Sequence, residues 1–248
     1  MAKKSGLGGQ IFVHGYDLSG DVAAIDGAGS PRNLLEITAI NASATERLVG
    51  LSDGNISVSS WFNDSTEQEH AALSGLVTTD RIVTWAFGAT RGDVAACLVA
   101  KQLNYDASRG TDGSLSFSVD TQADGISLDW CNTLTTGKET HSSAGSSTSR
   151  DDGAGTTAGM VAYLEITDCD SGTPTVQIQE SSDNGSSDAW TNVLVFSTVG
   201  YASAPTAERV TSSGTVERYL RVTTTGTFSN LDFCVSTRRG TSQDDVTF

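Results

Sequence analysis

The residues that could do chemistry are scattered along this 248-residue chain and match no known catalytic spacing. His14, His70 and His141 do not form the H-x-x-x-H or H-E-x-x-H pattern that places two imidazoles on one helix face to bind zinc. The chain contains no G-x-S-x-G nucleophile elbow and no G-x-x-x-x-G-K-[ST] phosphate loop. We therefore predict no catalytic residue, no cofactor and no enzymatic activity.

The cysteines and the acidic turns, the other residues that could bind a metal ion, can be explained without one. The four cysteines are far apart and include no C-x-x-C pair, so we expect free thiols in a reducing compartment rather than a zinc site. Calcium needs six to eight oxygens from converging loops, and spacing alone shows no convergence, so we expect no metal. The acidic turns weighed for calcium are Asp151-Asp152, Asp168-Cys169-Asp170 and Asp183-Asn184-Gly185.

Charge and hydropathy narrow the classes of partner. Thirty acidic residues against fifteen basic ones give a net charge of −15, which both halves share. Such a chain should not bind nucleic acid, because contacts with phosphate need Lys and Arg. The negative charge also favours solubility. The longest apolar run, Val94–Ala100, is far shorter than the ~20 residues of a membrane span, and Met1–Gly9 lacks a signal-peptide pattern. We expect a cytoplasmic product with no membrane partner.

The apolar pattern predicts a mainly β fold with one short helix. Ile56–Trp61 alternates apolar and polar residues with a period of two, which indicates a half-buried strand. Asn63–Thr66 can cap a helix whose first turn holds Glu67 and Glu69, and Gly75 can end it. Further strands are expected at 11–13, 34–40, 81–87, 95–104, 114–122, 126–134, 161–166, 175–180, 193–198, 219–222 and 231–237.

Segments rich in turn residues separate these strands. Asp26–Pro31 and Tyr105–Gly113 are expected to be loops, and Asn41–Asp53 a long polar excursion. Thr135–Gly159 is dominated by Ser, Thr, Gly and Asp and contains no large apolar residue, so we interpret it as a linker. This gives a β domain at 1–134, a linker at 135–159 and a second β-sandwich at 160–248, where five or more short strands follow one another.

The first 130 residues resemble the tail tube (major tail) proteins of long-tailed bacteriophages, especially those that infect actinobacteria. The resemblance lies in Leu34-Leu35-Glu36-Ile37-Thr38, Glu46-Arg47-Leu48-Val49-Gly50-Leu51-Ser52-Asp53-Gly54, Ile56-Ser57-Val58-Ser59-Ser60-Trp61-Phe62-Asn63, Glu69-His70-Ala71-Ala72-Leu73-Ser74, Cys97-Leu98-Val99-Ala100-Lys101-Gln102-Leu103-Asn104-Tyr105-Asp106 and Asp112-Gly113-Ser114-Leu115-Ser116-Phe117-Ser118-Val119. It implies a tail-tube-type β-sandwich or barrel.

The same resemblance implies an assembly function. Copies would join into rings, usually hexameric, that stack into the virion tail tube, an acidic conduit for double-stranded DNA that passes without specific binding. The other partners would be the tape measure and tail terminator proteins. The tail would be assembled in the host cytoplasm. The family stacks its rings through long loops and terminal arms, which correspond by position to Asn41–Asp53 and Met1–Gln10 here. Within the first of these segments, Glu46, Arg47 and Leu48 would contact a neighbouring subunit. The acids expected to face the bore are Asp53, Asp80, Asp112 and Asp120.

The second half resembles, more loosely, the small immunoglobulin-like or carbohydrate-binding sandwiches appended to phage structural proteins. The residues concerned are Val176–Gly185, Trp190 and Glu217–Val222. This leaves an alternative open: a capsid decoration or fibre-type protein whose C-terminal sandwich binds host surface glycans. A platform of Trp190 and Tyr201 would serve that purpose, although core packing is the default for tryptophans on predicted strands.

Overall fold

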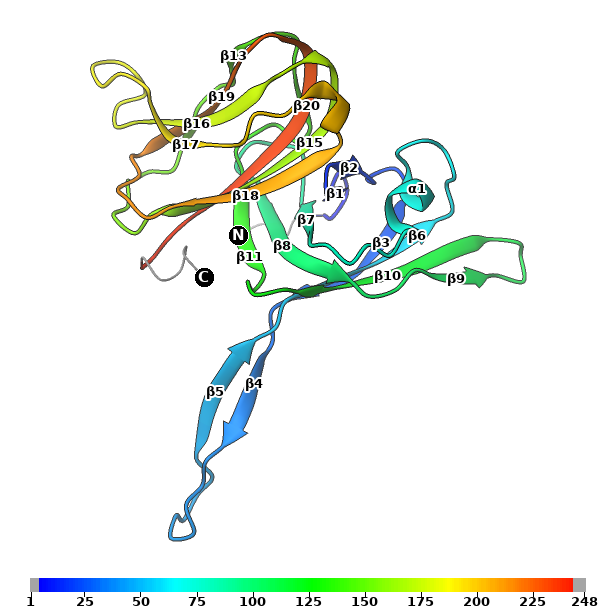
Figure 1. Ribbon diagram of the computed structural model, residues 1–248. Coiled ribbons are helices and arrows are strands. Elements are labelled where there is room, and N and C mark those ends of the chain that lie inside the picture. The colour runs from blue at the N-terminus through cyan, green and yellow to red at the C-terminus, as the bar shows by residue number, and fades with distance from the viewer. Residues whose placement is uncertain (1–4, 243–248) are drawn as a thin grey trace.

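The computed structural model describes residues 5–242 and consists mainly of antiparallel strands (Figure 1). The mainly β class expected from the sequence is therefore confirmed. The N-terminal half contains α1 (Glu69–Leu73) and eleven strands. They are β1 (Gln10–Val13), β2 (Tyr16–Asp17), β3 (Val22–Gly29), β4 (Arg32–Glu36), β5 (Arg47–Ser52), β6 (Asn55–Trp61), β7 (Arg81–Ala86), β8 (Val94–Gln102), β9 (Asp106–Arg109), β10 (Leu115–Ala123) and β11 (Asp129–Thr133).

The C-terminal half forms a sandwich of two sheets. Its elements are β15 (Met160–Gly172), β16 (Thr175–Ser181), β17 (Thr191–Val195), the 3-10 turn η1 (Tyr201–Ser203), β18 (Thr206–Ser212), β19 (Tyr219–Thr225) and β20 (Phe228–Arg239). One layer holds β18, β15 and β20, and in the other β13 (Gly145–Ser146) is followed by β19, β16 and β17. Leu164, Ile178, Val222 and Phe233 belong to the core between the two layers.

The expected linker at 135–159 is structured. It contains β12 (Glu139–His141), β13 (Gly145–Ser146) and β14 (Arg150–Asp151), which pair with β20 and β19. These Ser- and Gly-rich strands bury little apolar area. They are held instead by backbone pairing and by ion pairs of the Asp152 carboxylate with Arg150 and Arg239.

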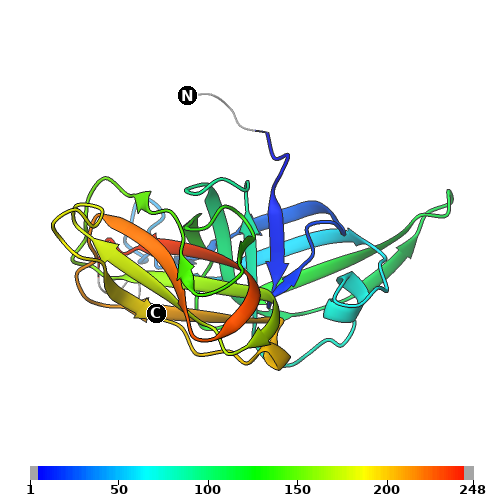
Figure 2. The same ribbon diagram turned by 90° about the horizontal axis from the view of Figure 1, so that it is seen from above.

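One sheet continues across the proposed domain boundary, in the order β18-β15-β20-β11-β8-β10-β6-β3, and the two halves lie side by side along it (Figure 2). The N-terminal half has its own core, which includes Ile11, Val58, Leu73, Leu98 and Val119. A third, smaller cluster joins the halves where Val161 and Tyr163 of β15 pack against Ile82, Ala95, Cys97 and Cys131. The division into two folding units stays a proposal, since the halves have separate principal cores but share a sheet.

Three segments expected to be loops contain strands. β3 extends through Gly29, within the Asp26–Pro31 segment, and pairs with β6 through two register irregularities. β9 lies within Tyr105–Gly113, and β5 within Asn41–Asp53. In β3 and β9 a partner strand holds residues of low strand propensity, so tertiary context overrides local preference there, whereas β5 carries Leu48, Val49 and Leu51, whose apolar character already suits a strand. The helix is shorter than expected: it begins at Glu69 and ends at Leu73, and Leu76 is exposed.

A buried carboxyl group links the two halves. The Glu165 side chain of β15 is fully buried and accepts hydrogen bonds from the Gly15 backbone N–H at 2.6 Å and the Thr84 hydroxyl at 2.9 Å. Burial raises the pKa of Glu165 to about 8, while these two hydrogen bonds act in the opposite direction. The Gly15 turn fits tightly here, because a Cβ atom at Gly15 would collide with the backbone of Ile166 and Thr206.

The raised pKa of Glu165 predicts a pH-dependent stability. The folded state holds this proton more tightly than the unfolded chain, so the free energy of unfolding should fall as pH rises from about 4.5 to about 8. Glu165→Gln keeps the neutral geometry and should be as stable as the parent at pH 5. At pH 9 it should be more stable, by ~1.4 kcal/mol per unit of pKa shift at most. Urea unfolding at both pH values measures the difference; Glu36→Gln, on an exposed strand, is the control. Identical pH dependence in parent and E165Q would contradict this role.

Candidate assembly surfaces

A long two-stranded arm, β4–β5, stands clear of the body of the molecule (Figure 1). It continues the β3–β6 hairpin: Gly29 pairs with Asn55, and Arg32 pairs with Ser52 in the same register beyond a short break. Pro31 lies at this break and accepts a hydrogen bond from the Asp53 N–H at 3.0 Å. At ~3.3 Å per strand residue, the stretch from Arg32 to the Ile40 tip extends roughly 30 Å.

Both faces of this arm carry exposed apolar side chains. Leu35 and Leu48 are a cross-strand pair and share one face, while Leu34 and Val49 share the other. Leu51 is 87% exposed and Leu48 53%. An isolated two-stranded hairpin is marginally stable in water, and soluble monomers rarely expose large contiguous apolar patches. The arm therefore has the character of a surface that a partner covers. Its large apolar side chains are Leu34, Leu35, Ile37, Ile40, Leu48, Val49 and Leu51.

The root of the arm is fixed to the body. The hydroxyl of Ser52 lies 2.5 Å from that of Ser30 and 2.7 Å from that of Ser127, and Ser30 also contacts Ser127. Gly54 packs closely there, because a Cβ atom would lie 2.6 Å from the Leu128 backbone nitrogen. These contacts define the direction in which the arm leaves the sheet.

The three residues expected at a subunit contact all lie on the arm. Leu48 and Arg47 are in β5, opposite Leu35 and Glu36, and the Glu46 carbonyl accepts a hydrogen bond from the Ile37 N–H. Their contact with a neighbour stays a prediction. The apolar residues around them were not expected at this contact, although three large apolar residues within Leu48-Val49-Gly50-Leu51 are a visible signal. Met1–Lys4 of the expected N-terminal arm lie outside the described residues.

A second candidate surface is the polar face of the sheet formed by β3, β6, β10 and β9. Ser57 and Ser59 of β6 lie opposite Asp120 and Ser118 of β10, on the face away from the core residues Ile56, Val58 and Val119. The Ser59 hydroxyl donates a hydrogen bond to the Asp26 carboxylate of β3 at 2.5 Å. Hydroxyl groups and carboxylates make up much of this face, which also carries the half-exposed Trp61 of β6, and its carboxylates would repel a phosphate backbone.

The four acids expected to face the bore occupy different places. Asp120 lies on the polar face and accepts a hydrogen bond from the Asn104 side chain at 2.9 Å. Asp112 is exposed in the β9–β10 turn, and Asp53 is exposed at the root of the arm. Asp80 forms an ion pair with Lys101, which also pairs with Asp124 at 3.3 Å. The structure therefore places one of the four on the polar face, and their orientation toward a bore stays a prediction.

This sheet has two open edges within the described residues. β3 pairs with β6 alone, and β9 pairs with β10 alone. β9 continues the path of β8 along the same side of β10, but β8 goes on to pair with β7 and β11 whereas β9 has no strand beyond it. Natural proteins usually cover or interrupt such edges, because their free N–H and C=O groups recruit further strands.

Several titratable groups of the described residues have structural partners, although the buried Nδ1 of His14 has none. Glu69, fully buried, accepts hydrogen bonds from the Ser60 and Tyr105 hydroxyls, both at 2.8 Å, which holds α1 against the sheet. The Asp151 carboxylate pairs with Arg218, and the pKa of Asp151 is lowered to about 2 mainly by this contact. All four cysteines are buried free thiols. In residues 5–242 no group of three or more His, Cys, Asp or Glu side chains is arranged to hold a metal ion.

The C-terminal sandwich gives the sugar platform little support. The Arg221 guanidinium lies 4.4 Å from the centre of the Trp190 ring and covers one of its faces. Tyr201 is exposed on η1, a separate element. No helix among the described residues has the length and apolar character that crossing a bilayer requires.

Comparison with known proteins gives weak structural likenesses. No family model and no curated protein matches the chain. A component of the virion of a native gene transfer agent particle is similar over 52% of this chain and 98% of its own, with a TM-score of 0.42 and 13% identity. A component of the tail of an empty gene transfer agent particle, refined with C6 helical symmetry, has a TM-score of 0.39, 14% identity and the same coverage.

The Dit protein of phage SPP1, described as a paradigm of the hub adsorption apparatus in phages that infect Gram-positive bacteria, is similar over 93% of this chain and 98% of its own. Its TM-score is 0.34 and its identity 10%. At these scores the likenesses carry no functional inference, so function has to be inferred from the geometry of the chain itself.

The arm and the core should respond differently to mutation. Leu48→Asp on the arm should change the free energy of unfolding by less than ~0.5 kcal/mol, since surface substitutions rarely do more. Leu98→Ala in the fully buried core should cost about 2–5 kcal/mol. Chemical denaturation of dilute, unassembled protein measures both. A loss of several kcal/mol in L48D would show that the arm packs against its own body in solution.

Proposed function

We propose that this protein is a structural subunit of a phage tail tube, in which copies join edge to edge into rings and the rings stack through the β4–β5 arms. The observation that carries the proposal is the sheet with two open edges, β3 on one side and β9 on the other. In residues 5–242 neither β3 nor β9 has a partner strand on its outer side, so each is available to a neighbouring copy.

The strand directions suit such pairing. β3, β6, β10 and β9 are successively antiparallel, so the two outer strands, β3 and β9, run in opposite directions. If β9 of one copy lies beside β3 of the next, the new pair is again antiparallel, and the addition can repeat. A head-to-tail contact of this kind closes into a ring when the rotation between copies allows it. Six copies per ring remains an expectation from the family resemblance.

The polar face then supplies the bore. In a closed ring one face of the continuous sheet points inward, and the Ser- and Asp-bearing face opposite the core is the one compatible with water and DNA. Negative charge on that wall would let a phosphate backbone pass without sticking. The resemblance adds the tape measure and tail terminator proteins as partners and places the C-terminal sandwich outside the tube, in a tail assembled in the host cytoplasm.

Stacking is assigned to the arm. It extends beyond the body by roughly 30 Å and carries its apolar residues on both faces, so contact with another ring would remove them from water. Contacts along the ring axis do not close and therefore propagate a filament.

Ring formation should require the outward backbone groups of β9. The Gly110 N–H donates to the Ser114 carbonyl, so this pair is a hydrogen-bonded one. Hydrogen-bonded and non-hydrogen-bonded pairs alternate along an antiparallel ladder, so Ala107, three residues before Gly110, is in a non-hydrogen-bonded pair and its N–H points away from β10. Ala107→Pro removes that donor without removing a bond to β10. We expect a folded protein, by circular dichroism, that forms no rings under negative-stain electron microscopy. Ala39→Pro, in the loop at the tip of the arm, is the control and should still form rings. Normal rings from A107P would exclude β9 as the ring edge.

A different substitution should prevent the stacking of rings without preventing their formation. Leu48→Asp places a charge within the apolar surface of the arm, so we expect rings without filaments, whereas the parent forms tubes of uniform width. Microscopy and sedimentation velocity distinguish rings from tubes. Discrete parent oligomers combined with saturable glycan binding would favour the decoration or fibre alternative instead.

A further inference from the structure

An exposed aromatic cluster lies on the body of the molecule, on and beside β7, β8 and β11. The rings of Trp85 and Phe87 are 4.3 Å apart between centroids, and those of Phe87 and Trp130 are 5.9 Å apart. Trp130 is 48% exposed, Val94 41% and Phe87 37%. We call Trp85, Phe87, Val94 and Trp130 the aromatic shelf.

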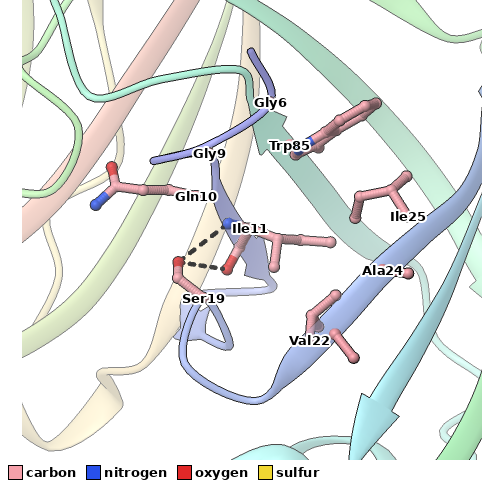
Figure 3. A pocket seen from close by; sticks show the side chains of 10 residues that line it. Gly6, Gly9, Gln10, Ile11, Ser19, Val22, Ala24, Ile25 and Trp85 are labelled. Atoms are coloured by element: carbon pink, nitrogen blue, oxygen red, sulfur yellow. Dashed lines mark hydrogen bonds between the residues drawn. The ribbon is translucent and has the colours of Figure 1, made fainter.

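The shelf forms one continuous surface because its residues share a face of the sheet. Ala96 of β8 pairs with Trp85 on one side and with Trp130 on the other. Trp85 also lines a cavity of about 280 Å³ between β1 and β3, together with Ile11, Val22 and Ile25 (Figure 3). The shelf thus continues into a hollow of mixed lining, where Gln10 and Ser19 lie beside the apolar side chains.

We propose that the aromatic shelf receives the β4–β5 arm of a second copy of this chain. The inference rests on the proposed function, which assigns the arm to stacking but does not say what it contacts. Both surfaces are apolar and unpartnered in one copy, and the arm of that copy is directed away from its body (Figure 1). A contact between an arm and a different surface is heterologous, so each copy keeps a free arm or a free shelf and the assembly continues.

The sizes of the two surfaces support this occupant. Seven large aliphatic side chains on the arm, each about half exposed or more, present on the order of several hundred Å² of apolar area. The shelf offers less than the ~150–250 Å² of a whole aromatic side chain at each ring, because its residues are at most about half exposed. A standard interface buries ~800 Å² on each partner, and the arm can lay only one of its two apolar faces on a shelf, so a single contact is weak and stability comes from the ring of such contacts acting together.

The shape of the arm fits as well. Each face of the arm presents one aliphatic cross-strand pair, Leu35 with Leu48 or Leu34 with Val49, and such a pair can lie against the ring of an aromatic side chain. The fixed root of the arm lowers the entropy that binding costs, because its direction is already set.

Trp130→Gln tests the shelf. This side chain is half exposed, so the variant should fold, and loss of its contact should raise the concentration needed for filaments about tenfold or more while rings still form. Tyr201→Gln, with a similarly exposed aromatic side chain on η1, is the matched control and should assemble like the parent. Filaments from W130Q at the parent's concentration would overturn the shelf as acceptor.

Mixing variants identifies the pairing. L48D lacks a working arm but keeps its shelf, and W130Q lacks the shelf but keeps its arm. At the parent's assembly concentration neither should form filaments alone, whereas a mixture should form pairs of stacked rings, visible by sedimentation velocity, that grow no further. No complex in the mixture would show that the arm binds elsewhere. If W130Q forms filaments and L48D does not, the proposed stacking role survives and the shelf is excluded; if both form filaments, the stacking role fails as well.

Proximity can be read directly from cysteine pairs, since the four native thiols are buried. Leu48→Cys mixed with Val94→Cys should form a disulfide-linked dimer on mild oxidation, absent from either variant alone. Leu103→Cys, exposed elsewhere on the body, should not cross-link to Leu48→Cys. Equal cross-linking to both positions would indicate non-specific association of the arm.

Discussion

The constraint on which the structure depends is the burial of β15 on both faces. Along this strand, Met160, Ala162, Leu164 and Ile166 belong to the core of the C-terminal sandwich, while Val161 and Tyr163 pack against the N-terminal half. A strand covered on both sides reads as a continuous apolar run rather than an alternating one, which is the pattern in Met160–Leu164. Because consecutive residues of one strand serve two clusters, the two halves are coupled through its backbone.

Polar contacts at the same junction fix the register of this coupling. The Tyr163 hydroxyl donates to the Asp129 carboxylate at 2.6 Å, and Arg238 donates to the same group at 3.0 Å. Glu165, two residues further along β15, binds Gly15 and Thr84 of the N-terminal half. Buried polar groups are costly when unpaired, so these contacts disfavour any shifted packing of one half on the other. The body that results holds the arm, the shelf and the two sheet edges at set relative positions.

The sequence predicted those parts whose local pattern and tertiary environment agree. Ile56–Trp61 alternates and is a half-buried strand, and Ala72 and Leu73 face the core from the short helix as their spacing requires. β3 was missed because Asp26, Gly27 and Gly29 favour turns, and only pairing with β6 keeps them extended. The strands within 135–159 were missed for the same reason. Of the site, the arm position of Leu48 could be predicted by resemblance, but its pairing with Leu35 depends on a register that composition does not reveal. Nor can sequence spacing bring Trp85, Phe87 and Trp130 together, since β8 lies between the strands that carry them.

Self-assembly of an acidic subunit is opposed by electrostatic repulsion between copies, and exposed apolar groups must offset that repulsion. With a net charge of −15, copies repel one another at distances up to the Debye length, ~8 Å at physiological salt. Apolar contact and strand pairing act only at shorter range, so association must be favourable enough there to offset the repulsion. In residues 5–242 the arm and the shelf are exposed apolar surfaces, and β3 and β9 are uncovered strand edges. In the proposed assembly, electrostatic repulsion between subunits therefore disfavours non-specific association. Only an arrangement in which the arms, the shelves and the strand edges are all in contact is favourable enough to offset it.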